Sequence, residues 1–381
     1  MKGAFIPLSR EEDEFRVHKK GIEFDFRGFK DIDEDLKKRD FTINAISYDL
    51  KSKEFYDPYH GQEDLKRRVL RLVSEDSLIL DPLRVLRGLR FALEINLGID
   101  PDFYTRAEQV SLTGIAPERI WMELSRILRQ DSFKVIKMID RLDLFTQIVP
   151  ELTVLKMSPY WNHSLLTLRY VEEAIKKGIE KDLQPEYQDY LDESFRIPIL
   201  KLAGLLHDLA KPKTRIEKDG EVHFYGHDIL GSRIVTEIGK KRLRLSNRET
   251  KMLSKLVREH MRPHLLSGGE LTERAVRRFI RDLGSDFIGC MILAWADGKA
   301  TAGKTRHLRK IFRKIITIYR IDKEKASFKR LINGYDLIDL GLEPGPIFRI
   351  ILTEVEEQQK DGLIKTKEEA LALAKKLLEE V

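Results

Sequence analysis

The sequence has very little cysteine and no long apolar run, and each shortage excludes a class of protein. Cys290 is the only cysteine among 381 residues, so no disulfide forms within the chain, which is typical of the reducing cytoplasm. No apolar run approaches the roughly 18 residues that a membrane span needs. The first residues have neither a long apolar stretch nor a small-residue cleavage site, so we expect no signal peptide. We therefore expect a cytoplasmic protein without membrane association.

The composition describes a folded, basic protein. Hydrophobic residues make up 42% of the chain and charged residues 35%, values of a globular protein rather than a disordered one. A length of 381 residues allows two or three domains, and we see no internal repeats. The net charge of +6 suits a polyanionic partner such as RNA, although many basic proteins bind none.

Apolar periodicity changes from strand-like to helical along the chain. In the segment GIEFDF, Ile22, Phe24 and Phe26 alternate with charged residues, which places the apolar set on one face of a strand. From about Leu80 onward, apolar residues recur every three or four positions, the period of helices. The expected class is mainly α with a small N-terminal β portion. The polar stretch at residues 176–195 is predicted to be a surface insertion between two helices.

The segment RDFTIN, which begins at Arg39, carries side chains suited to a nucleotide. Arg39 can hold a triphosphate oxygen, and Asp40 or Asn44 can bond a ribose hydroxyl. From the residues alone, an ordinary strand-to-helix turn has equal weight. In that alternative Arg39 is solvated, and Asp40 or Thr42 caps the helix.

The segment DPLRVLR begins with a helix start, because Asp81 is a good N-cap and Pro82 suits the first helical position. Arg84 then lies near the positive end of the helix dipole, which disfavours a cation by a few tenths of a kcal/mol. Arg87 and Arg90 follow at one-turn spacings and continue a basic face. An arginine in this place is better explained if it meets an anion or a base edge. A solvated basic face is the alternative.

The two segments, with DPYHGQEDLKRRVLR between them, resemble the class II CCA-adding tRNA nucleotidyltransferase and bacterial poly(A) polymerase family. Order, spacing and motifs match over nearly the whole chain. The resemblance implies that the basic-Arg-Asp motif grips ribose and triphosphate, and that an Asp and an Arg of the second segment act as a protein template reading CTP or ATP. Lys38 stands where the family has arginine, and Leu80 where it has glutamate. The predicted nucleotide-binding residues are Lys38, Arg39, Asp40, Asn44, Asp81, Arg84 and Arg87.

The family's first motif, a strand with Asp-x-Asp, is not found in the chain. Phosphoryl transfer with two Mg²⁺ ions needs carboxylates that bridge both ions. Such enzymes take a further carboxylate from a later strand, for which Asp25 is the catalytic candidate and Glu23 the second choice. The DID segment at residues 31–33 lies where the family has an ordinary helix start. We therefore expect no nucleotide transfer by this chain alone, unless another chain supplies the missing head strands.

An ordered set of histidines and aspartates lies in the middle of the chain. A His-Asp pair inside the apolar segment KLAGLLHDLA is costly to bury unless something pairs with it. Imidazoles and carboxylates are ligands for Mn²⁺, Ni²⁺, Fe²⁺ or Zn²⁺. Any one of these histidines alone is more often a core or capping residue, but the ordered set resembles the HD superfamily of metal-dependent phosphohydrolases. The resemblance implies the metal ligands His163, His207, Asp208 and Asp297, with His227, His260 and Lys211 as auxiliary residues.

The expected architecture is a partial nucleotidyltransferase head (1–60), a helical neck that binds nucleotide and RNA (61–152), an HD domain (153–305) and a helical tail (306–381). The expected function is that of a CCA-adding or poly(A) polymerase family protein that binds CTP or ATP and the 3′ end of tRNA or other RNA. One alternative is an HD-type phosphohydrolase acting on 2′,3′-cyclic phosphates of RNA ends or nucleotides. The other is a non-catalytic RNA-binding protein.

Overall fold

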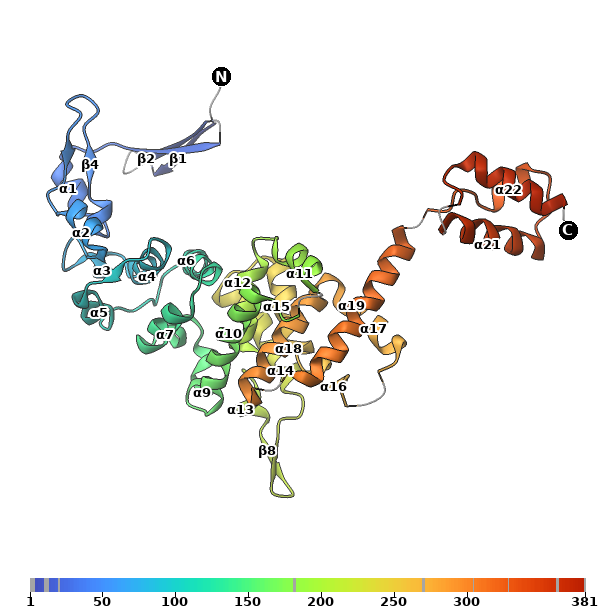
Figure 1. Ribbon diagram of the computed structural model, residues 1–381. Coiled ribbons are helices and arrows are strands. Elements are labelled where there is room, and N and C mark those ends of the chain that lie inside the picture. Colours follow the sequence, from blue (N-terminus) through green and yellow to red (C-terminus); the bar gives the residue numbers. More distant parts are fainter. Residues whose placement is uncertain are drawn as a thin grey trace. The chain divides into compact units, whose positions relative to one another are not determined.

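The computed structural model describes residues 4–9, 14–19, 21–180, 183–268, 271–303, 305–327, 329–360 and 363–379. Helices make up most of this part of the chain, and most of its short strands lie near the N-terminus (Figure 1). The predicted class, mainly α with a small N-terminal β portion, is confirmed. The chain divides into two compact units, Met1–Arg313 and Lys314–Val381. None of the described helices is long and apolar enough to cross a membrane.

Three antiparallel strands come first and pair in the order β1-β2-β3. Their bounds are β1 (Ala4–Ser9), β2 (Glu14–Lys19) and β3 (Ile22–Arg27). The predicted alternation is confirmed, because Phe24 pairs with Val17 and Phe26 with Phe15, whose ring lies 5.0 Å away, centroid to centroid. Phe24 and Phe26 remain 46% and 47% exposed. The described residues thus leave the apolar face of β3 partly uncovered.

A compact group of short elements follows the sheet. They are α1 (Ile32–Lys37), η1 (Thr42–Asn44), β4 (Ser47–Tyr48), β5 (Phe55–Tyr56), α2 (Gly61–Arg67) and β6 (Val69–Leu70). Asp31 is the N-cap of α1 and accepts a hydrogen bond from the backbone N–H of Asp33 at 2.9 Å. The DID segment is therefore the helix start that the sequence predicts.

One aromatic residue and one glycine anchor the loop between α1 and α2. Phe41 is fully buried, with the rings of Phe91 and Phe103 at 5.9 and 6.4 Å between centroids. Gly61 lies against the backbone of Thr42, and a Cβ added to it would come within 2.1 Å of the Thr42 carbonyl oxygen. A side chain at this position would therefore displace the loop.

The next elements run from residue 77 to residue 152. They are α3 (Ser77–Leu80), α4 (Arg84–Glu94), β7 (Gly98–Ile99), α5 (Pro101–Ala107), α6 (Pro117–Arg129), α7 (Phe133–Arg141), α8 (Leu144–Ile148) and η2 (Pro150–Leu152). Helix α4 begins at Arg84, later than the Pro82 that the sequence predicts. The predicted basic face is wrong for Arg90, which is buried and bonds Glu94 and Glu123 at 2.5 Å each.

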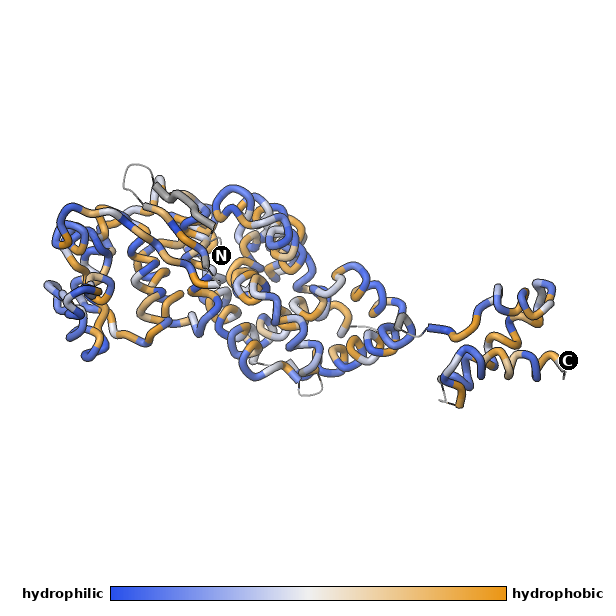
Figure 2. Tube along the Cα trace, turned by 90° about the horizontal axis from the view of Figure 1, so that it is seen from above, coloured by the Kyte–Doolittle hydropathy of each residue, from blue (hydrophilic) through white to orange (hydrophobic). Residues whose placement is uncertain are grey.

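A helical body packs after η2, and Figure 2 shows apolar and polar stretches alternating along its helices. Its elements are α9 (Thr153–Lys156), α10 (Tyr160–Lys177), α11 (Gln184–Leu191), α12 (Arg196–Leu206), α13 (Lys211–Thr214), β8 (Ile216–Lys218), β9 (Glu221–His223), α14 (His227–Glu237), the π-helical turn η4 (Ile238–Arg242), α15 (Asn247–Glu259), α16 (Arg262–Leu265), α17 (Glu273–Leu283), η5 (Gly284–Asp286) and α18 (Phe287–Ala302). The surface insertion predicted at residues 176–195 is wrong in part, because Tyr187 and Tyr190 of α11 are buried.

A buried ion pair joins α12 to α10 and to the start of α7. Lys201, 2% exposed, donates to Glu172 Oε1 at 2.8 Å and to the carbonyl of Gln130 at 2.5 Å. Glu172 also accepts from the backbone N–H groups of Ser132 and Phe133, at 2.7 and 3.2 Å. Every charge in this network has several partners, so it fixes the body against the preceding helices.

The C-terminal helices are α19 (Arg306–Ser327), α20 (Gly334–Asp339), α21 (Pro346–Lys360) and α22 (Lys367–Glu379). The second compact unit has a core of its own, made of Ile332, Leu337, Ile351, Val355, Ile364, Ala370 and Ala374. The C-terminal helices therefore pack around apolar residues of their own.

Candidate functional sites

The turn between α1 and η1 is organised around the carboxylate of Asp40, which is 6% exposed. Asp40 Oδ1 accepts from its neighbour's backbone N–H and from Asn44 Nδ2, both at 2.9 Å. Its other oxygen lies 2.5 Å from Arg87 Nε on α4. Three of the predicted nucleotide-binding residues thus lie in one connected group, which also ties the turn to α4.

Arg84 clamps the backbone of the same turn from α4. Its guanidinium donates to the carbonyl of Lys38 at 2.6 Å and to Ser77 Oγ at 2.9 Å. Burial lowers the pKa of Arg84, while Asp40 and Asp81 oppose that effect. Sequence reasoning missed Ser77. Its hydroxyl helps to hold Arg84, whose positive charge lies near the N-terminus of its own helix, where the helix dipole disfavours it.

Arg39 lies at the open side of the turn. Its guanidinium bonds Asp35 Oδ2 at 2.6 Å, and its side chain is 44% exposed. A groove of about 880 Å³ adjoins it, lined by Arg39 and Asn44 together with Phe29, Tyr48 and other residues of the head. An exposed guanidinium beside a groove can meet an anionic ligand.

Asp81 lies at the start of α4 with one oxygen on its own helix and one on a distant arginine. Oδ1 accepts from the backbone N–H of Leu83 at 3.2 Å, but the predicted N-cap role of Asp81 is wrong, because α4 begins at Arg84 and its N-cap is Leu83. Oδ2 accepts from Arg119 Nη2 at 2.7 Å. Arg119 belongs to α6, and nothing in its local sequence pointed to this contact.

The two carboxylates predicted for metal binding lie on β3 and face one arginine of β2. Asp25 accepts from Arg16 Nε at 2.6 Å and from Nη2 at 2.9 Å, and Glu23 lies 3.2 Å from Arg16 Nη1. The hydrogen bond from Arg16 lowers the pKa of Asp25. Among the described residues, no hydrogen bond or ion pair joins either carboxylate to the Asp40 turn.

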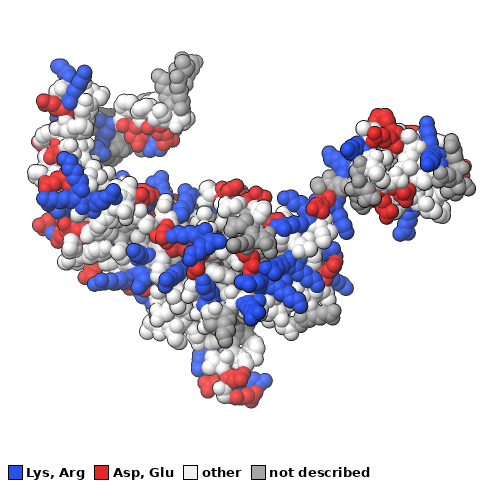
Figure 3. All heavy atoms as spheres, viewed as in Figure 1, with Lys and Arg blue, Asp and Glu red and all other residues white. Residues whose placement is uncertain are grey.

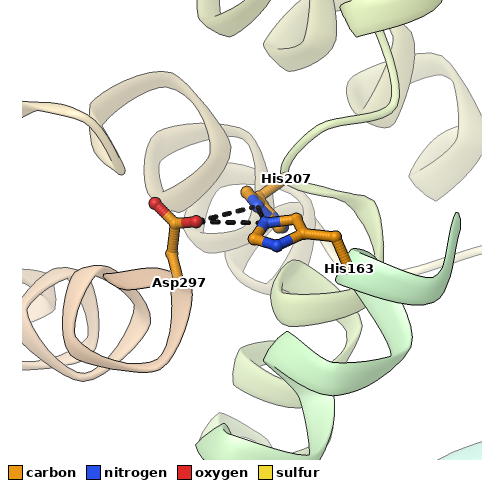
Figure 4. A group of neighbouring side chains, drawn as sticks. All are labelled: His163, His207 and Asp297. Atoms are coloured by element: carbon orange, nitrogen blue, oxygen red, sulfur yellow. Dashed lines mark hydrogen bonds and ion pairs between the residues drawn. The ribbon is translucent and has the colours of Figure 1, made fainter. Parts of the chain in front are cut away.

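The histidine–aspartate cluster comes together from three helical segments of the body (Figure 4). His163 of α10 has its Nε2 3.0 Å from Asp297 Oδ1 of α18 and 3.2 Å from His207 Nε2. Asp208 Oδ2 lies 3.4 Å from His163 Nε2 and 3.2 Å from His207 Nε2. The four predicted ligands thus converge on one point with atoms that a divalent cation takes.

Asp208 turns its other oxygen to a second pair of histidines. Oδ1 lies 3.7 Å from His227 Nε2 and 3.8 Å from His260 Nε2, and these two nitrogens are 3.3 Å apart. Asp208 is fully buried, and the ammonium of Lys211 lies 2.6 Å from its Oδ2. A buried carboxylate that faces imidazoles on both sides fits a metal site, because each of its oxygens lies beside ring nitrogens that can bind the same cation.

A contact between Nδ1 and a nearby backbone carbonyl fixes the ring orientation of three of these histidines. Each lies near a helix end and directs its Nδ1 at the carbonyl three residues earlier: His207 to Gly204 at 3.0 Å, His227 to Phe224 at 2.7 Å, and His260 to Val257 at 2.6 Å. A proton on Nδ1 leaves the lone pair on Nε2, which is the atom that faces the cluster. Such support from outside a ligand set orients metal-binding imidazoles.

The charge state of the cluster also favours a cation. Burial lowers the pKa of His207, but the charges and hydrogen bonds of Asp208 and Asp297 outweigh it and raise that pKa to about 10. Burial and the charge of His207 lower the pKa of His260 to about 4. The carboxylates thus keep the His207 imidazole protonated in a buried place, and a divalent metal ion would supply positive charge there instead.

Two neighbours extend the cluster, one predicted and one not. Lys211, an auxiliary candidate, lies with its Nζ 2.6 Å from Asp208 Oδ2. His264 has its Nε2 3.4 Å from Asp297 Oδ2, and its Nδ1 contacts His307 Nε2 at 3.2 Å. The sequence analysis missed His264, although its spacing of four residues from His260 was a signal for one helix face.

Models of protein families match three parts of the chain. "Poly A polymerase head domain" covers residues 7–71, "Probable RNA and SrmB- binding site of polymerase A" covers residues 106–155, and "HD domain" covers residues 160–300. The first includes the Asp40 turn, and the last includes all four predicted metal ligands.

Known proteins are similar to this chain over nearly its whole length. The A-adding tRNA nucleotidyltransferase of Deinococcus radiodurans is 31% identical, over 99% of this chain and 87% of that protein. The CC-adding tRNA nucleotidyltransferase of Thermus thermophilus is 28% identical, over 97% and 83%. Among solved structures, the Thermotoga maritima CCA-adding enzyme complexed with tRNA has a TM-score of 0.58 at 18% identity, over 99% and 82%, which supports the fold.

Proposed function

Because the chain belongs to the tRNA nucleotidyltransferase family, whose enzymes add nucleotides to RNA 3′ ends, we propose that it binds CTP or ATP together with the 3′ end of tRNA. The observation that carries the proposal is the connected group of Asp40, Asn44, Arg84 and Arg87, which joins the turn to helix α4. We place it in the cytoplasm, which the buried free thiol of Cys290 supports.

Each part of this group has a chemical task in the proposal. Arg39, half exposed beside the groove, holds triphosphate oxygens, and Lys38 adds a second cation on the same turn. Asp40 or Asn44 forms a hydrogen bond with a ribose hydroxyl. Asp81 accepts from the exocyclic amino group that cytosine and adenine share. Arg84 donates a hydrogen bond to the backbone of the turn, so it links base recognition at the start of α4 to ribose binding by the turn.

An Asp81→Ala variant is expected to bind CTP and ATP about tenfold to a hundredfold more weakly, because a hydrogen bond to a charged group contributes about 1.5–3 kcal/mol. Its preference over UTP and GTP should also fall, since those bases carry a carbonyl in place of the amino group. Equilibrium binding of the four nucleotides measures both effects. Asp102→Ala, which removes another arginine-paired carboxylate, is the control. Unchanged CTP binding by Asp81→Ala would refute the role of Asp81 as template.

The carboxylates of the described residues do not fit a two-ion Mg²⁺ site. Asp25 and Glu23 are engaged by Arg16 on the strand next to theirs, and one metal carboxylate alone cannot hold two Mg²⁺ ions. We therefore derive no transfer step from these residues. The polypeptide of residues 1–381 is expected to bind nucleotide and tRNA but to extend no tRNA. Incorporation of labelled CTP or ATP into tRNA by that polypeptide would contradict this expectation.

The apolar face of the N-terminal sheet supports a proposal about what completes the head. Phe24 and Phe26 are half exposed there, and Phe29, Tyr48 and Phe55 are exposed around the groove. We infer that a strand-bearing segment outside residues 1–381, on the same polypeptide or another, covers this surface and supplies the further carboxylates. Such a segment should pair with a strand edge of the sheet.

A second function, metal-dependent hydrolysis of phosphate esters, is favoured by one observation: the buried carboxylate of Asp208 faces a pair of imidazoles with each of its oxygens. We propose that His163, His207, Asp208 and Asp297 hold a divalent transition metal, and that Asp208, His227 and His260 hold a second. Bound metal would activate water, and Lys211 is placed to hold a phosphate oxygen. The substrates would be 2′,3′-cyclic phosphates of nucleotides or RNA ends.

A further inference from the structure

A polar cleft lies on the body along α14, η4 and α15, apart from the sites already described. Its volume is about 390 Å³, and its lining has hydroxyl, amide and cationic side chains but no carboxylate. Its cations are Lys240, Lys251, Lys255 and Arg258. A cleft lined by one sign of charge concentrates ligands of the opposite sign.

Two of the four cations are not engaged elsewhere. Lys255 donates to the carbonyl of Leu283 at 2.9 Å and to Asp286 at 3.2 Å, and Arg258 lies 3.7 Å from Glu259. Lys240 and Lys251 are exposed and form no ion pair or hydrogen bond with the described side chains, although the charge of Lys240 also acts on Glu237. Their charges are therefore available to an outside partner.

The wall of the cleft also holds a polar group without a partner. Thr250 is 5% exposed, and its hydroxyl has no hydrogen-bond partner in the described part of the molecule. Nearby, the hydroxyls of Thr236 and Ser254 are 3.0 Å apart and link α14 to α15. A buried hydroxyl without a partner is unusual, and it marks a place where an oxygen ligand would satisfy a donor.

The cations of this cleft are spread over a greater length than a single phosphate group can contact. Asn247 and Arg258 both line the cleft, and the α15 segment between them spans roughly 16 Å. Arg258 also lines a second cleft, of about 680 Å³, with Arg262, Arg274 and Arg278. That cleft includes two carboxylates, Glu259 and Asp282, so its cations are partly neutralised. On the face shown in Figure 3, Lys and Arg also cover more of the body than Asp and Glu do.

We propose that the α15 surface, made by Lys240, Lys251, Lys255 and Arg258, binds consecutive backbone phosphates of an RNA. A polymer of phosphates engages cations spread over this length, whereas one free phosphate reaches only a part of them. The inference rests on the proposed function, since it names an RNA contact of the same protein outside the nucleotide site. It assigns the HD body a share in holding the RNA.

The test compares tRNA binding by the full chain and by a Lys240→Ala/Lys251→Ala double variant over a range of salt concentrations. Two lost phosphate contacts should make the slope of log K against log salt shallower by about 1.4 to 1.8. Lys213→Ala/Lys218→Ala, which removes two other exposed lysines of the body, is the matched control and should leave the slope unchanged. CTP binding, which is remote from this surface, should be the same in all three proteins and reports intact folding.

The outcomes separate this inference from the proposed function. If the unmodified chain binds no tRNA, the proposed function fails. If it binds tRNA and the double variant shows the same affinity and slope, the α15 surface holds no RNA. A third arm titrates inorganic phosphate and follows thermal stability. Stabilisation that the double variant abolishes, with an unchanged RNA slope, would identify a site for free phosphate and overturn the RNA proposal.

Discussion

An Asp208→Asn variant is expected to lose divalent metal and to hydrolyse 2′,3′-cyclic nucleotide phosphates more than about 100-fold more slowly. Changes to groups that merely support metal ligands already reduce affinity or activity by about 10–100-fold, and Asp208 faces both imidazole pairs directly. An amide lacks the charge that balances the cation and offers only one oxygen to it. Metal content of the purified protein, measured by mass spectrometry, and turnover of the cyclic phosphate check the two parts.

The chain provides a matched control for this substitution. Asp228 follows His227 in the sequence as Asp208 follows His207, but it belongs to neither candidate metal group of the described residues. Asp228→Asn should therefore retain metal and turnover. Wild-type metal content and turnover in Asp208→Asn would rule out the metal role of Asp208. Metal that binds normally to a chain without any turnover would leave the site standing and reject the phosphohydrolase proposal.

A Lys201→Met variant is expected to lower the free energy of unfolding by about 3–5 kcal/mol, because it leaves the carboxylate of Glu172 buried without its cation. Burial lowers the pKa of Lys201, and the charge of Glu172 opposes that effect, so the ammonium and the carboxylate each depend on the other to stay charged. Urea unfolding followed by circular dichroism measures the change.

The control for Lys201 is a lysine of similar chemistry at the surface. Lys176 pairs with Asp131 at 2.5 Å, but the two side chains are 53% and 65% exposed. Lys176→Met should therefore change stability by only about 0–1 kcal/mol. Equal effects of the two substitutions would show that the buried pair is not what fixes the body to the preceding helices.

Local patterns were sufficient for most of the fold. The alternation in β3 depends on neighbours within a few residues and is confirmed, and α1 does begin at the DID segment, where the family resemblance implies a helix start. The prediction of a surface insertion at 176–195 is wrong in part. Polar residues dominate the stretch, but its structure depends on two buried tyrosines, Tyr187 and Tyr190. Burial of a few side chains in a polar helix leaves almost no periodic signal.

The candidate sites show the same limit. Sequence analysis selected Asp81 and Arg84 from a resemblance, but their partners Arg119 and Ser77 came only with the fold. Arg119 lies 38 positions after Asp81, a separation at which no helical or strand period connects residues. Arg90 was predicted to lie on an exposed basic face because of its spacing from Arg87. In the structure it is buried instead, because Glu123 of α6 pairs with it.

The carbonyl contacts at Nδ1 divide the four imidazoles of the cluster into two kinds. His207, His227 and His260 each have a ring held by the chain three residues earlier, so their Nε2 atoms are set before any metal arrives. For His163, the described residues show no such contact at Nδ1, and its side chain is 17% exposed. Three imidazoles of the cluster are thus held through Nδ1, whereas the contacts of His163 are at Nε2, with Asp297 and His207. We expect a metal ion to enter and leave on the side of His163, the most exposed of these four imidazoles.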